Sequence, residues 1–228
     1  MIKQKKIVKE KKKYRRYKVV FLIDDNNDWI KKHLLVYNFG FKKKFGFKIE
    51  KKINKIKRKD IVFILGYTKI LSNKFLKKNR YNLVVHESNL PKGKGFAPVQ
   101  SQILKNQNKI PICLLEATEK VDSGKIYEKG YFNLSGKEIY QEIRYKQAQA
   151  TFKIIKKFLK KFPNISCTKQ IGKENFFKRR FAKHHKLNIN KTIKQQFNLL
   201  RIGNNDLFPS FFIYRGQKYI LKIFKKDK

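Results

Sequence analysis

Cysteine is scarce in this chain of 228 residues, which contains only Cys113 and Cys167. The two lie far apart and show none of the spacings of metal ligands, so the sequence predicts no metal site. Cys113 stands inside the apolar run at residues 112–115, where a buried core thiol is expected rather than a reactive one.

Long apolar stretches are also absent. No segment approaches the ~20 apolar residues that a transmembrane helix needs. The N-terminus is basic, but the apolar run that follows at residues 19–23 is too short for the core of a signal peptide. We therefore expect a cytoplasmic protein without a membrane span.

Acidic residues are few. The chain has 16 Asp and Glu residues against 58 Lys and Arg residues, so its formal net charge is +42. A field of this sign attracts nucleic acids and other anionic surfaces. The excess is mostly lysine, which is spread from end to end of the chain. Asn, Ile, Phe and Tyr are also abundant, and this residue set is typical of proteins encoded by AT-rich genomes. We favour this compositional drift as the larger cause, and a functional affinity for phosphates stays open.

The residues that are present suffice for a folded core. A hydrophobic content of 41% and an aromatic content of 14% exclude a disordered tail. Apolar runs predict buried strands at residues 17–24, 61–65, 83–85 and 110–115. A short edge strand is predicted at residues 47–49. Helical patterns lie between them at residues 29–41, 72–78 and 98–105. This alternation predicts an α/β fold with a Rossmann-like, mostly parallel sheet flanked by helices.

A long helix is expected after this sheet. Residues 135–138 match a capping box and predict a helix to about Lys161, which residues 162–164 end. A loop-rich link follows, in which the adjacent His184 and His185 are expected to be solvated rather than bound to metal.

A small C-terminal region completes the predicted architecture. Residues 190–201 predict a helix, and residues 211–223 predict two strands about an Arg-Gly turn. The sequence thus divides into a basic N-terminal extension at 1–16, a main domain at 17–162, and a linker with a small helix and hairpin at 163–228.

The chain is organised around residues 82–124. One strand delivers His86 to a turn, residues 90–95, whose Pro and Gly residues let the backbone approach a ligand closely. The next strand leads into a polar loop that carries Asp122. We expect the imidazole and the carboxylate to meet at one edge of the sheet, at the C-terminal ends of neighbouring strands.

Four ordered motifs in this stretch carry a family resemblance. They are His86-x-Ser88, Leu90-Pro91-x-Gly93-x-Gly95, Ala97-Pro98-Val99-Gln100 and Val121-Asp122-Ser123-Gly124. Together they resemble the catalytic core of the folate-dependent formyltransferases, which include methionyl-tRNA and sugar N-formyltransferases. Upstream, residues 66–71 are similar to the segment that borders the folate pocket in that family.

The resemblance implies transfer of a formyl group from 10-formyltetrahydrofolate to a primary amine, without a metal. It assigns proton movement to His86 and the orientation of its ring to Asp122. The positions that it implies for folate are Tyr67, Ile70, Leu71, Val121 and Asp122. Those that it implies for the amine substrate are Ser88, Lys92, Gly93, Lys94, Gly95 and Gln100, together with the loop at residues 24–28.

The acceptor expected from the resemblance is a nucleotide-linked amino sugar. The chain stops after a helix and hairpin like those of sugar N-formyltransferases, whereas methionyl-tRNA formyltransferases continue into a barrel that grips tRNA. Methionyl-tRNA stays an alternative because of the charge. A catalytically impaired basic binding protein on the same fold is a third hypothesis.

The sequence departs from the family pattern at one catalytic position. The family has Asn-x-His, in which the Asn amide helps to hold the formyl oxygen, and this chain has Val84 there. Asn82 lies on the same face of the strand but about 13 Å from His86 at the usual strand rise, so it cannot substitute. Ser88, Asn89 and Gln100 are the candidate replacement donors.

Overall fold

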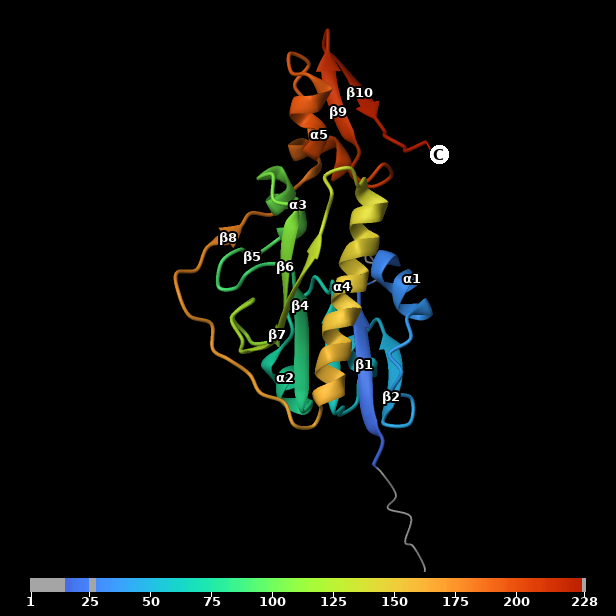
Figure 1. The fold of residues 1–228 in the computed structure, drawn as a ribbon, viewed down its shortest axis with the longest axis vertical. Coiled ribbons are helices and arrows are strands. Elements are labelled where there is room, and N and C mark those ends of the chain that lie inside the picture. Colours follow the sequence, from blue (N-terminus) through green and yellow to red (C-terminus); the bar gives the residue numbers. More distant parts are fainter. Residues whose placement is uncertain (1–14, 25–27, 227–228) are drawn as a thin grey trace, which may run out of the picture.

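The computed structural model describes residues 15–24 and 28–226. The predicted N-terminal extension and the loop after the first strand therefore lie mostly outside the described residues. A six-stranded sheet with the strand order β2-β1-β3-β4-β6-β7 forms the body of the molecule (Figure 1). Its strands are β1 Tyr17–Ile23, β2 Phe45–Glu50, β3 Ile61–Leu65, β4 Tyr81–His86, β6 Lys109–Glu116 and β7 Ile126–Asn133.

The first four strands of the sheet are parallel, and β6 and β7 are antiparallel to their neighbours. The predicted mostly parallel sheet is confirmed. The apolar runs form its centre because both faces are covered, and all five residues of β3 are buried. The strand β7 has no counterpart in the sequence prediction, because residues 128–130, Glu-Lys-Gly, split its apolar residues into two pairs that stay short of a continuous run.

Helices cover the sheet on both faces. They are α1 Asp28–Val36, α2 Asn73–Lys78, α3 Pro98–Leu104 and α4 Tyr140–Lys161, with a short 3-10 turn at Ile53–Lys55. The larger core lies between the sheet and α1 and α4, where Phe21, Phe63 and Phe158 pack together. The opposite face holds a smaller cluster that includes Val62, Ile64 and Phe75. His86 lies on this second face, because it shares a face of β4 with Val84, which packs on this cluster.

Two helix boundaries differ from the prediction. The helix α4 begins at Tyr140 rather than at the Ser135 box, because Glu138 turns back to accept hydrogen bonds from Ser135 N–H at 2.8 and 2.9 Å. Gly136 between them has a φ of +89°, which closes a turn instead of opening a helix. The helix α1 ends at Val36, ahead of a turn in which Gly40 N–H donates to the Asn38 side chain.

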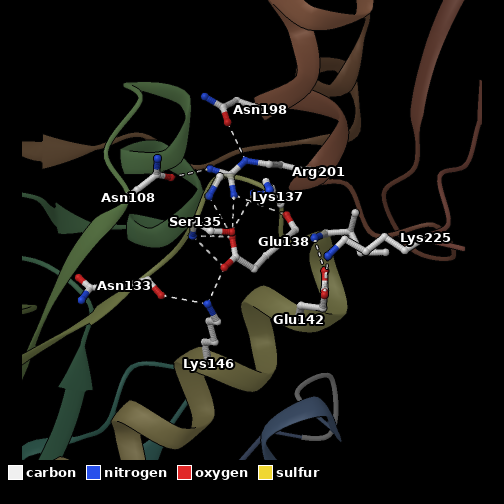
Figure 2. A network of polar contacts seen from close by, with 12 residues as sticks. Asn108, Asn133, Ser135, Lys137, Glu138, Glu142, Lys146, Asn198, Arg201 and Lys225 are labelled. Carbon is white, nitrogen blue, oxygen red and sulfur yellow. Dashed lines mark hydrogen bonds and ion pairs between the residues drawn. The ribbon is translucent and has the colours of Figure 1, made fainter. Parts of the chain in front are cut away.

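The C-terminal region contains α5 Ile193–Arg201 and the antiparallel hairpin of β9 Ser210–Tyr214 and β10 Gln217–Leu221, as predicted. It stands at the upper end of the molecule in Figure 1. Arg201, which is 1% exposed, joins it to the main domain. Its guanidinium lies 3.9 Å from the Glu138 carboxylate and donates to the Asn108 side chain at 2.9 Å (Figure 2).

The link between α4 and α5 is more ordered than a solvated loop. It holds the two-residue strand β8 Phe176–Phe177, which pairs with β5 Lys94–Gly95, and a 3-10 turn at Ala182–His185. The prediction for His185 is wrong, because this side chain is 6% exposed and its ring stacks on Phe208. Burial, with Arg180 and His184 nearby, lowers the pKa of His185 to about 4.

Candidate functional site

His86 and Asp122 meet, as the sequence predicted. The Asp122 carboxylate lies 3.5 Å from His86 Nδ1, and both side chains are buried, at 7% and 8% exposed. The other ring nitrogen, Nε2, lies 2.8 Å from the carbonyl of Gly93. Because a carbonyl only accepts, Nε2 carries a hydrogen, and a ring protonated on both nitrogens would donate to both partners.

The route by which Asp122 reaches His86 differs from the prediction. The strand β6 is antiparallel to β4 and pairs Cys113 with His86, so the carboxyl ends of these two strands point in opposite directions. The loop at residues 117–125 therefore folds back, and Glu116 N–H closes it on the carbonyl of Lys125. Asp122 has a φ of +52° within this loop. Its carboxylate accepts a hydrogen bond from Gly95 N–H at 2.9 Å, which ties the loop to the Pro-Gly turn.

Residues 163–181, which we call the strap, hold this loop from the other side. The strap runs from the end of α4 along the outer edge of the molecule and passes β5 (Figure 1). Gln170 Nε2 donates to the carbonyls of Asp122 and Gly124, both at 2.8 Å. Thr168 forms a bridge with Ile126 just after the loop. The loop thus has fixed contacts on both sides of its carboxylate.

The strap also fastens the Pro-Gly turn. Asn175 accepts from Gly93 N–H, with 2.6 Å to its side-chain oxygen. A Cβ at Gly93 would lie 2.6 Å from the Phe177 ring, and one at Gly95 would lie 2.8 Å from the Phe177 carbonyl. Both positions also have positive φ values, so the close approach of strap and turn requires glycine at both.

Lys94, a predicted substrate contact, is tied into the same arrangement. It is 3% exposed, and its ammonium contacts Glu174 of the strap at 2.6 Å and Ser123 at 2.9 Å. Hydrogen bonds from Lys94 and Lys120 lower the pKa of Glu174. In this structure Lys94 therefore joins the turn, the Asp122 loop and the strap.

Two of the positions implied for folate pack on the same side of the sheet as Val84. Tyr67, Leu71, Val84 and Ala117 pack around the smaller core cluster on this face of the sheet. Ile70 is 85% exposed and Val121 is 57% exposed, so both apolar side chains are free to cover a ligand. Asp24, at the end of β1, holds this border because it accepts from Thr68 N–H at 3.2 Å and from the Thr68 hydroxyl. An apolar surface with a few polar groups is what a planar heteroaromatic ring requires.

Four of the six residues implied for the amine substrate line two recesses. Ser88, Lys92 and Gly93 line one of about 510 Å³, which the strap residues Asn175 and Phe177 also border. Gln100 lines another of about 280 Å³ with Glu87 and Arg144, between α1, α3 and α4. In the second recess Gln147 donates to the Glu87 carboxylate at 2.6 Å, and the Arg144 guanidinium lies over the Trp29 ring at 4.6 Å.

Ser88 is a buried donor two residues after His86 in the chain. Its side chain is 2% exposed, and its hydroxyl has no hydrogen-bond partner among the residues that the structure describes. Asn82 is committed elsewhere, because its amide donates to the Leu76 carbonyl at 2.7 Å and accepts from Asn79. Val84 belongs to the apolar packing between the two smaller clusters. Cys113 is a buried core thiol, as predicted, and burial raises its pKa.

Sequence reasoning missed the roles of Gln170, Glu174 and Asn175. The only signal in the sequence was that these polar residues lie close together in a link that has neither helical nor strand periodicity. Within residues 15–24 and 28–226, no group of three or more His, Cys, Asp and Glu side chains could hold a metal ion. No helix in the described part of the chain is both long and apolar enough to cross a bilayer.

Comparison with known proteins adds a family to this geometry. A family model described as formyl transferase matches residues 1–158. Methionyl-tRNA formyltransferase of Rickettsia massiliae (strain Mtu5) is 30% identical over 119 residues, which cover 52% of this chain and only 39% of that protein.

Solved structures share the fold at low sequence identity. A methionyl-tRNA formyltransferase from Clostridium thermocellum matches with a TM-score of 0.79 and 16% identity over 92% of this chain and 94% of that one. A sugar N-formyltransferase from Shewanella sp FDAARGOS_354 matches with a TM-score of 0.65 and 14% identity, covering 92% and 98%. HypX from Aquifex aeolicus in complex with tetrahydrofolic acid matches with a TM-score of 0.72 and 12% identity, covering 92% and 38%.

Proposed function

Because the chain belongs to the formyl transferase family, we propose that it transfers a formyl group from 10-formyltetrahydrofolate to a primary amine. The observation that carries this proposal is the buried pair of His86 and Asp122, 3.5 Å apart. A carboxylate beside an imidazole fixes the ring and stabilises its charged form, which suits the ring for proton transfer.

His86 exchanges the proton at Nε2. Asp122 faces Nδ1, so Nε2 is the nitrogen left for the substrate amine, and in this structure the Gly93 carbonyl accepts its hydrogen. Asp122 is held for this task by Gly95 N–H on its carboxylate and by Gln170 on its backbone carbonyl. The amine must lose a proton in the reaction, and Nε2 accepts it in the tautomer whose hydrogen lies on Nδ1 toward Asp122, after the substrate amine replaces the Gly93 carbonyl as its partner.

Folate fits the apolar border of the site. The exposed side chains of Ile70 and Val121 and the packed Tyr67 and Leu71 supply a surface for its ring system. When bound there, 10-formyltetrahydrofolate supplies the electrophilic formyl carbon. Support comes from the fold shared with a structure that contains tetrahydrofolic acid.

Ser88 stabilises the formyl oxygen in place of the missing amide. Amine attack on a formyl carbon places negative charge on its oxygen, which a positioned donor stabilises. The Ser88 hydroxyl is buried and has no partner among the described residues, so it is available to donate. Val84 cannot donate, and Asn82 is already hydrogen-bonded.

The acceptor that we propose is a nucleotide-linked amino sugar. A sugar N-formyltransferase shares this fold, as does a methionyl-tRNA formyltransferase. The recess with Glu87 and Arg144 offers a carboxylate for an ammonium group and a guanidinium for a phosphate. Methionyl-tRNA is the second candidate, which the 30% identity to a methionyl-tRNA formyltransferase and the net charge of +42 favour.

Initial rates on both acceptors test the proposal. Purified protein is given 10-formyltetrahydrofolate with either a panel of amino sugar nucleotides or charged initiator tRNA, across a salt series. Phosphate-driven binding of tRNA weakens steeply with salt, whereas a sugar nucleotide with two phosphates weakens far less. Formylation of initiator methionyl-tRNA alone would replace the sugar assignment. Folate binding without transfer to any amine would favour the impaired binding protein.

A further inference from the structure

A second recess, of about 1240 Å³, lies at the opposite end of the sheet from the candidate site. It sits where β1, β3 and β4 begin, at the lower end of the molecule in Figure 1. Its lining residues, which we call the basin, are Arg15, Arg16, Lys18, Arg58, Lys59, Asp60, Lys77, Lys78, Asn79 and Arg80. Arg80 precedes β4 and His86 ends it, so the basin is about 20 Å from the imidazole at the usual strand rise.

The basin is almost free of compensating negative charge. Its one carboxylate, Asp60, is 7% exposed and accepts from the Arg15 guanidinium at 2.7 Å and from Lys18 N–H at 2.8 Å. Within the described residues, the other basic side chains of the basin have no carboxylate within salt-bridge distance. Their charges therefore remain available to an anion.

Compositional drift toward lysine does not explain this surface. The chain has nine arginines among its 58 basic residues, and four of the nine line the basin. Half of the cations here are thus guanidinium groups, although lysine dominates everywhere else. A guanidinium presents a planar fork of donors that binds phosphate oxygens in pairs, which an ammonium cannot do.

Two of these guanidinium groups are held in place by aromatic rings. Arg80 lies over Tyr81 at 5.4 Å and over Phe162 at 5.7 Å, and Arg15 lies over Tyr17 at 5.9 Å. Contact with a ring face restricts the side chain and leaves the N–H edges free. Less conformational entropy is then lost when a phosphate binds.

We propose that the basin binds the phosphodiester backbone of a folded RNA. The recess is larger than the ~300–1,000 Å³ of common small-molecule sites, and its cations surround it, so one small anion would leave most of them unpaired. A flat bilayer cannot reach the floor of a recess. Loops and ends of folded RNA protrude, and they present several phosphates to such a surface.

The basin acts separately from formyl transfer. At about 20 Å from His86, an RNA bound in it leaves the catalytic edge open. RNA binding can therefore be measured directly, whichever acceptor the catalytic site uses. Failure of either proposal leaves the other intact.

Matched triple variants of the full chain test the basin. Arg58→Gln/Lys77→Gln/Lys78→Gln removes three exposed basin charges, and Lys183→Gln/Lys191→Gln/Lys194→Gln removes three exposed charges near and in α5. The probe is a fluorescently labelled RNA hairpin, titrated at several salt concentrations. The basin variant is expected to bind roughly tenfold or more weakly, with the slope of log K against log salt reduced by about three. The control is expected to keep most of the affinity.

A charge-conserving variant separates guanidinium recognition from net charge. Arg16→Lys/Arg58→Lys/Arg80→Lys is expected to weaken RNA binding several-fold at constant charge, with the thermal midpoint checked for each protein. Equal losses in the two glutamine variants would overturn the proposal in favour of a diffuse field. A DNA hairpin of the same sequence that binds as tightly as RNA would also overturn it. The proposal would also be overturned if the basin variant lost its binding to phosphatidylserine vesicles while its RNA binding stayed unchanged.

Discussion

His86 faces a carboxylate on one nitrogen and a carbonyl on the other, and no other described side chain contacts its ring by a hydrogen bond or ion pair. We expect His86→Ala and Asp122→Asn each to lower formyl transfer by about 10²–10⁴-fold, since neither proton transfer nor ring orientation has a second residue to support it. Asp122→Asn is the sharper variant because its amide oxygen still accepts from Gly95 N–H. Initial rates on the identified acceptor, with folate binding measured in parallel, check both. Near wild-type rates in either variant would remove this pair from the mechanism.

The donor for the formyl oxygen is tested by a rescue. Ser88→Ala is expected to cost about 10²-fold in kcat, because the proposed oxyanion donor is lost. Val84→Asn restores the family amide two residues before His86 and is expected to recover much of that loss in the double variant. Asn133→Ala, at the exposed end of β7, serves as the control. A Ser88→Ala enzyme with unchanged kcat would show that another group stabilises the charge.

Single residues show where sequence reasoning succeeds and where it fails. His86, Asp122 and the glycines between them were predictable because they stand in ordered motifs within one stretch. Gln170 was not, because it lies in a link without periodicity and acts through backbone carbonyls rather than through a paired motif. His185 was misjudged because nothing in the sequence indicates that Phe208 packs on it.

Among the elements, the strap makes the most specific prediction. Gln170→Glu would place carboxylate oxygens against two carbonyls that need donors, so the Asp122 loop should lose its support. We expect kcat to fall roughly tenfold or more, with a shifted pH profile of kcat/KM, because the carboxylate no longer holds its place beside the imidazole. Lys169→Gln, an exposed neighbour on the strap, is the control. A loss of thermal stability with an unchanged pH profile would mean that Gln170 serves only the fold.

The elements themselves were largely predictable from apolar runs. Ser72 and Thr192 cap α2 and α5 in the structure, since each hydroxyl accepts from the N–H three residues on. The direction of β6 was not predictable, because an apolar run carries no information on which way the strand points. Because β6 runs antiparallel to β4, the loop that carries Asp122 must fold back to bring the carboxylate to His86.

At the scale of the whole molecule, one buried arginine joins the two parts of the chain. Figure 2 shows Arg201 of α5 pointing into the main domain toward Glu138 and Asn108. Arg201→Met is expected to lower the free energy of unfolding by about 3 kcal/mol, because it leaves a buried carboxylate with less compensation. Chemical denaturation measures this loss. Arg201→Met/Glu138→Gln should recover part of it, and no recovery would mean that packing rather than charge is lost.

The same network predicts how stability depends on acid. Burial alone would raise the pKa of Glu138, but hydrogen bonds from Lys146 and from Ser135 N–H outweigh it and hold that pKa at about 2, against an ordinary 4.5. A carboxyl whose pKa is lowered by folding stabilises the protein above its unfolded pKa, so this contribution is lost as pH falls from 4.5 toward 2. Wild type should lose more stability across that window than Glu138→Gln, as measured by urea denaturation at each pH. Parallel curves for the two proteins would contradict the assignment.

The strap also sets an order in time. Synthesis proceeds from the N-terminus, so all six strands of the large sheet, with His86 and Asp122, are made before Gln170 and Asn175. The scaffold is complete at the end of α4, whereas the contacts that hold the turn and the Asp122 loop come from residues beyond it. A fragment that ends at Phe162 keeps that whole sheet and lacks the strap. We therefore expect the smallest unit that folds to end before the strap and the smallest unit with the proposed activity to include it, so that a nascent chain completes its core before its candidate site.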